Sequence, residues 1–520
     1  MGHKTGKFSL LSATLRGVEA YPVTVEVSVS AGIPCMSIVG MPDTSIQESK
    51  ERIRSAIKSC GFQMPANRIV ANLAPGSIKK SGSGFDLSIA VCILAATGQI
   101  PLDNLNDMLI VGELSLDGTI RSVPGILAFG LCAQKNNKSL LSPPACDQCV
   151  EIKGTKQLNV LNLKDFVDQN FRYANFKNYQ NNNVEFFDFS DISGHDIAKR
   201  ALTIAACGNH GIFMIGSPGS GKTMLAKRMP SILPPLTEKE KIETAVIHSI
   251  AGSDVSPILQ GLRPFRAPHH SATLAGLIGG GTPMRPGEVS LAHNGVLYLD
   301  ELSEFASHVL QGIRQPMESG SVDITRADGS LKFPARFSLI ASSNPCPCGY
   351  YGDKEHTCQC SPSKILKYQQ KIGGPVLDRI DMHLNIFRLG PSEVLHTGSG
   401  VSSKALRDVV MKGKEYRHWR ENKENSKLCN NEVNNKLNAS NVSKGNMERL
   451  VESCNLQNTD MKLFEQIAKK NKMSGRGIMR VLSVARTIAD INQSRSVSYS
   501  HLCEAITFRV KEKADSAIVI

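Results

Sequence analysis

The segment from residue 216 to residue 223 carries the residue types that bind a nucleoside triphosphate. It follows the spacing G-x-x-x-x-G-K-T and reads Gly216, Ser217, Pro218, Gly219, Ser220, Gly221, Lys222 and Thr223. Glycines at these positions let backbone N–H groups converge on phosphate oxygens at the start of a helix. We expect Lys222 to neutralise the β- and γ-phosphates and Thr223 to offer its hydroxyl to Mg²⁺. The segment therefore predicts that the chain binds ATP and Mg²⁺.

Three further polar residues follow two apolar strand candidates. Gly295–Leu299 runs into Asp300 and Glu301, and Phe337–Ser343 runs into Asn344. We expect Asp300 to hold Mg²⁺ through water, Glu301 to polarise the attacking water, and the Asn344 amide to orient that water. The alternative is that these are ordinary solvated strand ends. Their position after the phosphate-binding segment favours the catalytic interpretation.

Four cysteines within fifteen residues form a candidate metal site: Cys346, Cys348, Cys358 and Cys360. Four thiolates that converge suit tetrahedral Zn²⁺, and a chain without a secretory signal is not expected to use its cysteines for disulfides. The C-x-C spacing is tighter than the usual C-x₂₋₄-C, so an unmetallated packed loop and a redox pair remain alternatives. His356 is an alternative ligand.

Charge and length limit the possible partners and the organisation. The chain has 60 Lys and Arg against 47 Asp and Glu, a net charge of +13, which favours a polyanion such as nucleic acid. No apolar stretch is long enough to span a membrane, and no signal sequence is recognisable at the N-terminus, so we expect a cytoplasmic protein. A single core does not grow to 520 residues.

We therefore expect about three domains. Residues 1–168 mix short strands and helices, and the Asn-rich residues 169–186 are typical of a linker. Residues 187–390 hold the phosphate-binding segment and the cysteines. Residues 391–520 are helical and basic, with an Asn/Lys-rich mobile loop expected at 421–443.

The elements that position these residues are also predicted. Val23–Val29 alternates like a half-buried strand, Thr44–Cys60 has helical spacing and ends at Gly61, and Asp86–Ala96 is typical of a buried helix. Gly211–Ile215 is an apolar strand directly before the phosphate-binding segment. Ser321–Phe337 is predicted to form a hairpin that turns at residues 328–329.

Residues 187–390 resemble an AAA+ ATPase of the magnesium-chelatase branch. Four segments of the chain closely resemble the ComM/YifB subfamily of this branch. They are Arg263–His270, Pro286–His293, Asn344–Gly349 and, near the C-terminus, Val484–Asp490. The resemblance runs from about Ala13 to Phe508. It implies an α/β fold: an AAA+ P-loop ATPase core with an N-terminal Lon-protease-like (S5-like) α+β domain and a C-terminal helical lid.

The same resemblance implies a function. It implies an ATP-hydrolysing motor that forms a homo-hexameric ring on single-stranded or branched DNA. The motor is expected to migrate branches in recombination intermediates during natural transformation, alongside recombination proteins. Arg379 falls at the family's arginine finger, which acts on the neighbouring subunit's nucleotide, and Arg476 at its sensor 2 position. The alternative for either arginine is a surface ion pair.

The predicted hairpin resembles one in minichromosome-maintenance helicases, where a basic residue touches DNA in the ring channel. Arg326 and Lys332 are the matching residues here, and Gly276–Gly281, with Arg285 and the His269–His270 pair, is expected to form a second channel loop. Ordinary polar turns are the alternative in each case.

Residues 69–130 resemble the Lon protease domain, through the string Gly112–Gly118, but without its Ser–Lys pair. The alignment puts Asp86 at the serine position and Leu127 at the lysine position, and a carboxylate with no adjacent base cannot run acyl transfer. A shifted pair drawn from Ser83, Ser88, Lys79 and Lys80 is the alternative. We therefore expect an ATPase that is not a protease.

One alternative function stays open. A chelatase-type motor, which remodels a protein or inserts a metal into a tetrapyrrole, would share the same nucleotide site. The net positive charge and the basic hairpin favour DNA over this alternative, and ATPase stimulation by DNA would separate the two.

Overall fold

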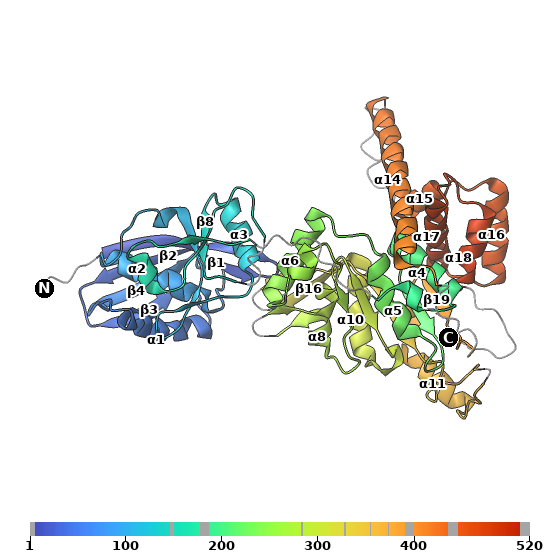
Figure 1. Cartoon of the computed structure of the whole chain (residues 1–520), viewed down its shortest axis with the longest axis horizontal. Coiled ribbons are helices and arrows are strands. Elements are labelled where there is room, and N and C mark those ends of the chain that lie inside the picture. The colour runs from blue at the N-terminus through green and yellow to red at the C-terminus, as the bar shows by residue number, and fades with distance from the viewer. Residues whose placement is uncertain are drawn as a thin grey trace.

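The computed structural model describes the chain in nine stretches: residues 6–145, 150–176, 187–281, 284–326, 329–353, 355–372, 374–390, 400–434 and 446–509. Three parts of the molecule lie in a row, with an N-terminal sheet domain at one end, a second sheet domain in the centre and a helical C-terminal part at the other end (Figure 1). Within the described stretches, no helix has both the length and the apolar character that a membrane crossing requires.

The N-terminal domain is built on an eight-stranded mixed sheet with the order β10-β9-β8-β5-β1-β2-β4-β3. Its strands are β1 (Gly6–Arg16), β2 (Glu19–Ser30), β3 (Cys35–Val39), β4 (Arg68–Ala74), β5 (Met108–Ile110), β8 (Ser139–Ser142), β9 (Gln157–Asn159) and β10 (Arg172–Tyr173). A separate ribbon pairs β6 (Glu113–Leu114) with β7 (Ile120–Arg121). The alternating segment predicted as a strand lies in β2, where its four valines are buried. Strand β10 falls in the segment predicted as a linker, so the sheet extends past residue 168.

Three helices cover this sheet: α1 (Thr44–Ser59), α2 (Asp86–Ala96) and α3 (Ile126–Lys135). Helix α1 begins where the Asp43 carboxylate accepts a hydrogen bond from the Ile46 N–H at 3.0 Å. It ends just before Gly61, whose φ of +84° is easily adopted by glycine. Helix α2 is buried from Asp86 to Ala95, as its uniformly apolar sequence predicts.

The central domain is built on a five-stranded sheet in which every strand runs parallel to its neighbours. The order is β12 (Phe265–Arg266), β15 (Val296–Leu299), β18 (Ser338–Ser343), β11 (Ile212–Ile215) and β19 (Met382–Asn385). Ile215 pairs with Ser343 and with Asn385, so the carboxyl ends of β11, β18 and β19 reach one edge together. Ligands of open parallel sheets bind at this edge.

Helices surround the central sheet, and two short ribbons extend from it. The helices are α4 (Asp196–Gly208), α5 (Lys222–Ile232), α6 (Glu238–Ala251), α7 (Ser256–Leu259), α8 (Leu274–Ile278), α9 (Glu288–Leu291), α10 (Ser307–Ser319), α11 (Pro362–Ile372) and α12 (Gly374–Leu377). The ribbons are β13 (Gly279–Gly280) with β14 (Arg285–Pro286), and β16 (Ser321–Arg326) with β17 (Gly329–Pro334). The second ribbon is the predicted hairpin.

In the described stretches of the C-terminal part, 400–434 and 446–509, the regular elements are all helices: α14 (Ser403–Asn434), α15 (Asn446–Cys454), α16 (Asn458–Lys470), α17 (Gly475–Ile491) and α18 (Tyr499–Thr507). Helix α14 projects beyond the rest of the molecule (Figure 1). The expectation of a loop at 421–443 is wrong up to Asn434, because α14 continues that far; residues 435–443 lie outside the described stretches. Lys and Glu in this polar segment are good helix formers, so its polarity does not exclude a helix.

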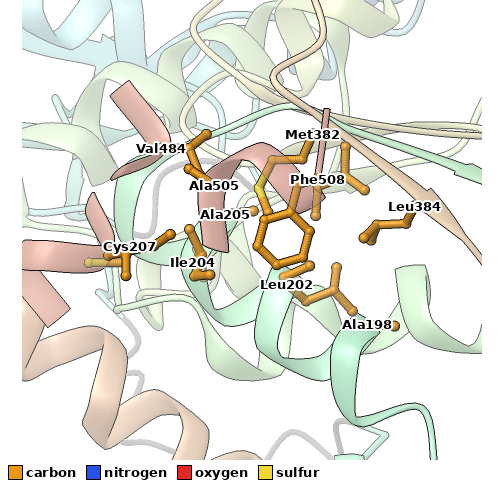
Figure 2. Close-up of a cluster of buried hydrophobic side chains, with 14 of the residues drawn as sticks. Ala198, Leu202, Ile204, Ala205, Cys207, Met382, Leu384, Val484, Ala505 and Phe508 are labelled. Carbon is orange, nitrogen blue, oxygen red and sulfur yellow. The ribbon is translucent and has the colours of Figure 1, made fainter. Parts of the chain in front are cut away.

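An apolar cluster joins the C-terminal helices to the central domain. Phe508, 4% exposed, inserts between α4 and β19, where it lies near Leu202 and Met382 (Figure 2). Val484 of α17 and Ala505 of α18 belong to the same cluster. The two parts therefore share one continuous core.

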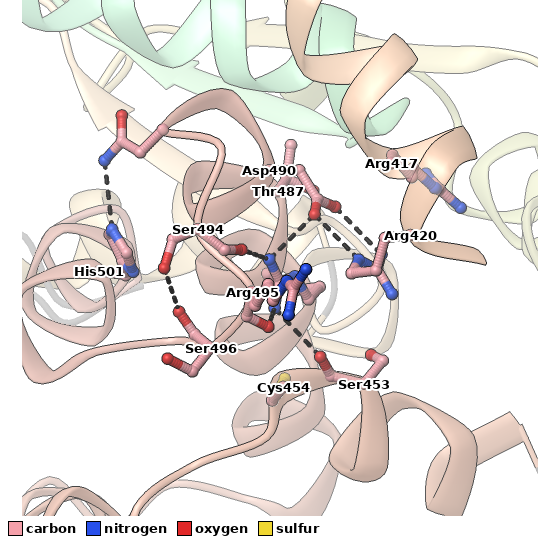
Figure 3. Close-up of polar contacts among 12 residues, drawn as sticks. Arg417, Arg420, Ser453, Cys454, Thr487, Asp490, Ser494, Arg495, Ser496 and His501 are labelled. Atoms are coloured by element: carbon pink, nitrogen blue, oxygen red, sulfur yellow. Dashed lines mark hydrogen bonds and ion pairs between the residues drawn. The ribbon is translucent and has the colours of Figure 1, made fainter. Parts of the chain in front are cut away.

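A buried charge cluster ties α14 to α17. Asp490 accepts hydrogen bonds from Arg420 of α14 at 3.0 and 3.1 Å and from Arg486 of its own helix at 2.9 Å (Figure 3). Arg486 also donates to the backbone carbonyls of Ser453 and Arg495. The string Val484–Asp490 that carries part of the family resemblance thus contributes to the packing of the helices.

The N-terminal domain packs directly against the central domain. Leu127 and Ala128 of α3 share a buried cluster with Ala245 and Val246 of α6. The β1–β2 turn meets the hairpin, where a Cβ added to Gly17 would lie 3.4 Å from a backbone oxygen of β17. The hairpin therefore has the N-terminal domain on one side.

Candidate nucleotide-binding site

The phosphate-binding segment connects the end of β11 to the start of α5. Gly219 and Gly221 have φ values of +76° and +89°, a region that favours glycine. A Cβ on Gly216 would lie only 2.2 Å from the Ile386 carbonyl oxygen. The three glycines are therefore required by the backbone path that turns the segment into the helix.

Lys222 is the first residue of α5, and its ammonium group points back into the loop. Nζ donates to the carbonyl oxygens of Gly216 at 2.7 Å and Ser217 at 3.0 Å, and lies 3.3 Å from Oδ1 of Asn344. Burial lowers the pKa of Lys222, and the carboxylates of Asp300 and Glu301 oppose that shift. The structure thus brings the predicted Lys222 and Asn344 together.

Thr223 and Asp300 meet at the neighbouring strand end. The Thr223 hydroxyl donates to Oδ2 of Asp300 at 3.1 Å, and the Ser342 hydroxyl donates to Oδ1. The Tyr298 hydroxyl donates to Thr223 Oγ1 at 3.3 Å. The sequence interpretation missed Ser342 and Tyr298, because both lie inside apolar strands, where the sequence pattern gives no functional signal. A hydroxyl and a carboxylate in contact suit Mg²⁺.

Glu301 stands at the same edge but faces solvent, with 52% of its side chain exposed. Its φ of +50° is unusual for a residue with a side chain and directs the chain sharply away from β15. His270 Nδ1 lies 3.7 Å from Oε2 of Glu301, and the ring centroids of His269 and His270 are 4.0 Å apart.

The segment Gly276–Gly281 was expected to form a second channel loop. That expectation is wrong in part, because Gly276 lies in helix α8 and Gly279–Gly280 forms strand β13.

The site fits a triphosphate and Mg²⁺. Ser220 Oγ is buried and has no hydrogen-bond partner among the described residues, although buried polar atoms normally have one. The Lys222 ammonium group donates to backbone carbonyls. It stands at the N-terminal, positive end of α5, where an anion is favoured and a cation is not. An oxyanion in the loop would satisfy both groups.

Arg388 is a residue of this site that the sequence interpretation missed. It lies three residues beyond β19 and donates to the carbonyl oxygen of Pro218 at 2.8 Å. Its second amino group lies 3.9 Å from Glu355. The sequence interpretation did not identify Met382–Asn385 as a strand of the sheet. Because β19 pairs in parallel with β11, a cation just beyond its carboxyl end lies near the phosphate loop, and this pattern could have identified Arg388.

Arg379 and Arg476 do not contact the phosphate loop of their own chain. Arg379 precedes β19 and so lies at the amino edge of the sheet, opposite the loop, where it forms an ion pair with Glu318 at 2.7 Å. Arg476 is exposed near the start of α17, and among the described residues no hydrogen bond or ion pair joins it to the loop. The site within one chain is therefore formed without either arginine.

The four predicted cysteines converge. Their sulfur atoms all lie within 4.8 Å of one another, and the Cys346–Cys348, Cys346–Cys358 and Cys348–Cys358 separations are 3.3, 3.7 and 3.5 Å. Tetrahedral Zn–S bonds of about 2.3 Å place sulfurs roughly 3.8 Å apart, so this set, which also includes Cys360, can hold a metal ion. His356 is not part of the set; its ring stacks on Tyr350.

The hairpin forms over the predicted segment, with Asp323 opposite Lys332 and Arg326 opposite Gly329. The turn predicted at residues 328–329 is wrong at Gly329, which is the first residue of β17, and residue 328 lies outside the described stretches. Lys332 is exposed along a groove of about 610 Å³ that lies between the hairpin and the β1–β2 turn. The lining of this groove includes the cations Arg16, Lys332 and Arg336. The lining also includes the carboxylate of Glu19, and Arg336 is ion-paired with Glu243 at 2.8 Å.

The positions aligned with the protease dyad are occupied by packing residues. Asp86 is fully buried and pairs with Arg52 at 2.6 Å; burial raises its pKa, against the effect of the Arg52 guanidinium. Leu127 lies in the interface with the central domain. The alternative pair gains no support from the hydrogen bonds of its members, since Ser83 donates to Glu113, Ser88 to the Phe85 carbonyl, and Lys80 to the Pro75 carbonyl.

Comparison with known proteins gives consistent matches along the chain. Family models for magnesium chelatase subunit ChlI match residues 25–145 and 188–394, and the model for its C-terminal region matches residues 400–509. Competence protein ComM of Haemophilus influenzae is 38% identical over 508 residues, which cover 95% of each chain. The YifB protein of Escherichia coli is 36% identical over 518 residues, 96% of each chain. The magnesium-chelatase 67 kDa subunit of Heliobacterium mobile is 30% identical over 199 residues, about a third of each chain.

Proposed function

This chain belongs to the ComM/YifB family of magnesium-chelatase-related proteins and has an α/β ATPase fold, and from that premise we propose that it is an ATP-hydrolysing ring motor that acts on DNA. The observation that carries the ATPase part is the convergence of Lys222, Thr223, Asp300 and Asn344 from three strand ends. This convergence supports binding of a triphosphate with its metal ion, for which Lys222 would turn from the loop carbonyls to the phosphate oxygens.

Each of these residues has a distinct task. Mg²⁺, when bound, would supply electrophilic polarisation of the γ-phosphoryl group. Lys222 would leave the loop carbonyls to bind phosphate oxygens, and Thr223 and Asp300 would hold the metal ion. Glu301, at the solvent-facing side of the same edge, polarises the attacking water, and Asn344 helps to orient it.

The position of Arg379 supports a ring, proposed to be a homo-hexamer. An arginine finger must reach the γ-phosphate, and Arg379 lies at the sheet edge opposite its own phosphate loop. A head-to-tail contact between subunits can bring the amino edge of one sheet to the nucleotide of the next, and such contacts close into rings. Release of Arg379 from Glu318 would accompany assembly. Arg476 is proposed to reach phosphate after the C-terminal helices move.

The net positive charge and the cations beside the hairpin support DNA as the polymer on which the motor acts. The net charge is +13, and Arg16, Lys332 and Arg336 line a groove beside the hairpin. The name of the competence protein of H. influenzae supports a role in natural transformation. The finer proposal, that this chain migrates branches in recombination intermediates in company with recombination proteins, rests on the family resemblance alone. We further propose that the four cysteines hold Zn²⁺.

DNA-stimulated ATP hydrolysis tests this proposal. Turnover is measured without DNA and with single-stranded, duplex and four-way-junction DNA at equal nucleotide concentration. We expect stimulation that is greatest for the junction. In the doubly substituted Arg326→Ala/Lys332→Ala variant, the slope of log affinity against log salt concentration should fall by up to about one unit for each phosphate that the variant no longer neutralises.

The exposed Lys462 on α16 provides a matched control, because Lys462→Ala removes a cation far along the chain from the hairpin. An ATPase that no form of DNA stimulates, together with an unchanged salt slope in the hairpin variant, would contradict the DNA proposal. That result would favour the chelatase-type motor that remodels a protein or a metal-insertion partner.

A further inference from the structure

The cysteine loop, residues 345–361, lies directly against the phosphate loop. A Cβ added to Gly349 would come within 2.6 Å of the Pro218 ring, so the two loops approach as closely as a glycine permits. Gly349 is itself buried, and its N–H donates to the Cys346 carbonyl at 2.9 Å. The turn that makes this contact therefore starts at one of the four cysteines.

A second contact involves the residue next to Pro218. The Ser217 side chain stabilises the Asp353 carboxylate, and together with the N–H groups of Glu355 and His356 it lowers the pKa of Asp353 to about 2. Those two N–H groups lie 2.9 and 3.0 Å from Oδ1 of Asp353. Asp353 is thus fixed by the cysteine loop and presents its charge to the phosphate loop.

Arg388 makes a third contact between the loops. It donates to the Pro218 carbonyl at 2.8 Å and reaches Glu355 of the cysteine loop at 3.9 Å. Two consecutive residues of the phosphate loop, Ser217 and Pro218, are therefore positioned from outside by the cysteine loop and by one arginine bound to both.

Apart from local contacts such as the Asp353 hydrogen bonds and the stacking of Tyr350 on His356, the cysteine loop has little to hold its shape. Among its described residues there is no helix or strand, and only Pro345, Cys346 and Gly349 are buried. A segment with so small a core depends on cross-links for a defined conformation, and a metal bound by four thiolates provides them.

We propose that zinc binding at Cys346, Cys348, Cys358 and Cys360 organises the phosphate loop, so that zinc and nucleotide each strengthen the binding of the other. The inference rests on the proposed nucleotide site and adds its regulation. Without the metal, Gly349 and Asp353 lose their fixed positions, and Ser217 and Pro218 lose the supports that aim their backbone at phosphate. Coupling of this kind is reciprocal and typically changes an affinity by about 5–150-fold.

The test measures both affinities on the full chain. Zinc content is determined per chain, and the dissociation constant of a fluorescent ADP with excess Mg²⁺ is measured before zinc removal, after removal by a chelator that spares Mg²⁺, and after zinc is restored. We expect a reversible loss of nucleotide affinity within the range above. Zinc affinity, measured by competition with a chromogenic chelator, should rise by the same factor when ADP is present.

Three variants separate the steps. Cys358→Ser/Cys360→Ser should lose zinc and weaken nucleotide binding together, whereas Cys35→Ser, which removes an exposed cysteine of β3, should change neither. Asp353→Ala keeps all four thiols, so it should retain one zinc per chain, bind ADP more weakly, and show a smaller response to zinc removal. Circular dichroism checks that each variant is folded.

The outcomes are distinguishable. Nucleotide affinity that is the same with and without bound zinc would overturn the coupling, and a chain that binds no zinc would overturn the metal site. Failure of the zinc-loaded chain to bind ADP at all would overturn the proposed nucleotide site and the coupling with it. Undiminished coupling in Asp353→Ala would overturn the assigned route through Ser217.

Discussion

Asp86 in the N-terminal domain and Lys222 in the central domain are local counterparts with different roles. Each is a charged, buried residue that begins a helix after a glycine-containing turn. Asp86 is neutralised by Arg52 and its negative charge suits the positive end of α2. Lys222 forms no ion pair among the described residues, and its charge opposes the positive end of α5.

The difference indicates how to tell a structural charge from a functional one. A buried charge that the fold neutralises needs no ligand, because its neighbours already supply its hydrogen bonds. Asp86, for example, accepts hydrogen bonds from the Leu114 N–H and from Nε and one amino group of Arg52. Among the described residues, by contrast, the buried Lys222 is held by carbonyl oxygens and has no anionic partner, and the neighbouring Ser220 hydroxyl has no hydrogen-bond partner. In the central domain a ligand anion would neutralise Lys222, whereas in the N-terminal domain Asp86 already has its partner and is part of the core.

Glu301→Gln tests the functional side of this comparison and has the largest expected effect. The substitution keeps size and hydrogen bonding but removes the charge that polarises water, so turnover should fall by about 10²–10³-fold. Binding of ATP and the melting temperature should be retained, because Glu301 is half exposed. Steady-state ATPase and nucleotide-binding titrations check this, with Glu304→Gln, an exposed neighbour, as the control. Normal turnover in the Glu301 variant would remove Glu301 from the site.

Asp86→Ala tests the structural side. It leaves the Arg52 guanidinium, 23% exposed, beside an apolar pocket, and loss of one partner of a buried pair destabilises by about 3–5 kcal/mol. Because Arg52 retains some solvent, we expect the lower end of that range. Thermal unfolding should show the loss, while nucleotide affinity measured below the transition should be unchanged.

Asp103→Ala, an exposed carboxylate of the same domain, is the control for the Asp86 substitution. A stable Asp86 variant with impaired nucleotide binding would reverse the comparison, because it would make Asp86 part of a functional site rather than of the core.

Mixing the Arg379→Ala and Glu301→Gln variants tests whether the site of the central domain is complete within one chain. The expected effect, a partial recovery of ATPase activity, is the smallest of those proposed. Each variant alone should be inactive. In an equal mixture with random assembly, roughly one interface in four combines an intact Glu301 with an intact Arg379 from the neighbour. ATPase activity should therefore recover to about a quarter of the unsubstituted level. Proven mixed assembly without recovery would show that Arg379 does not act across the interface.

Much of the site was predictable because its residues are close neighbours along the chain. The glycines of the phosphate loop, Lys222 and Thr223 belong to one continuous segment, and Asp300 and Asn344 each directly follow an apolar strand. The pairing of parallel strands then brings their carboxyl ends together, so that Ile215 lies opposite Ser343. The four cysteines were likewise recognisable from their spacing.

Contacts between residues distant in sequence were not predictable in this way. Arg388 reaches Pro218 across 170 positions, and Asp86 meets Arg52 across 34. Which arginine pairs with which carboxylate depends on how domains and loops pack, and many cations were available. The helical course of residues 421–434 was also missed, because polar composition does not separate a loop from an exposed helix.

The sequence by itself determined the chemistry of this protein, because a phosphate loop, strand-end carboxylates and thiol clusters depend on residue type, short spacing and local hydrogen bonding. Only the tertiary structure decided which of those groups face a ligand and which are already satisfied. It directs Lys222 towards carbonyls, buries Asp86 against Arg52, puts Arg379 at the edge opposite its own phosphate loop, and lays the cysteine loop on Ser217 and Pro218. The physical reason is that burial, and the demand it makes for a compensating partner, arises only when segments far apart in the chain pack together.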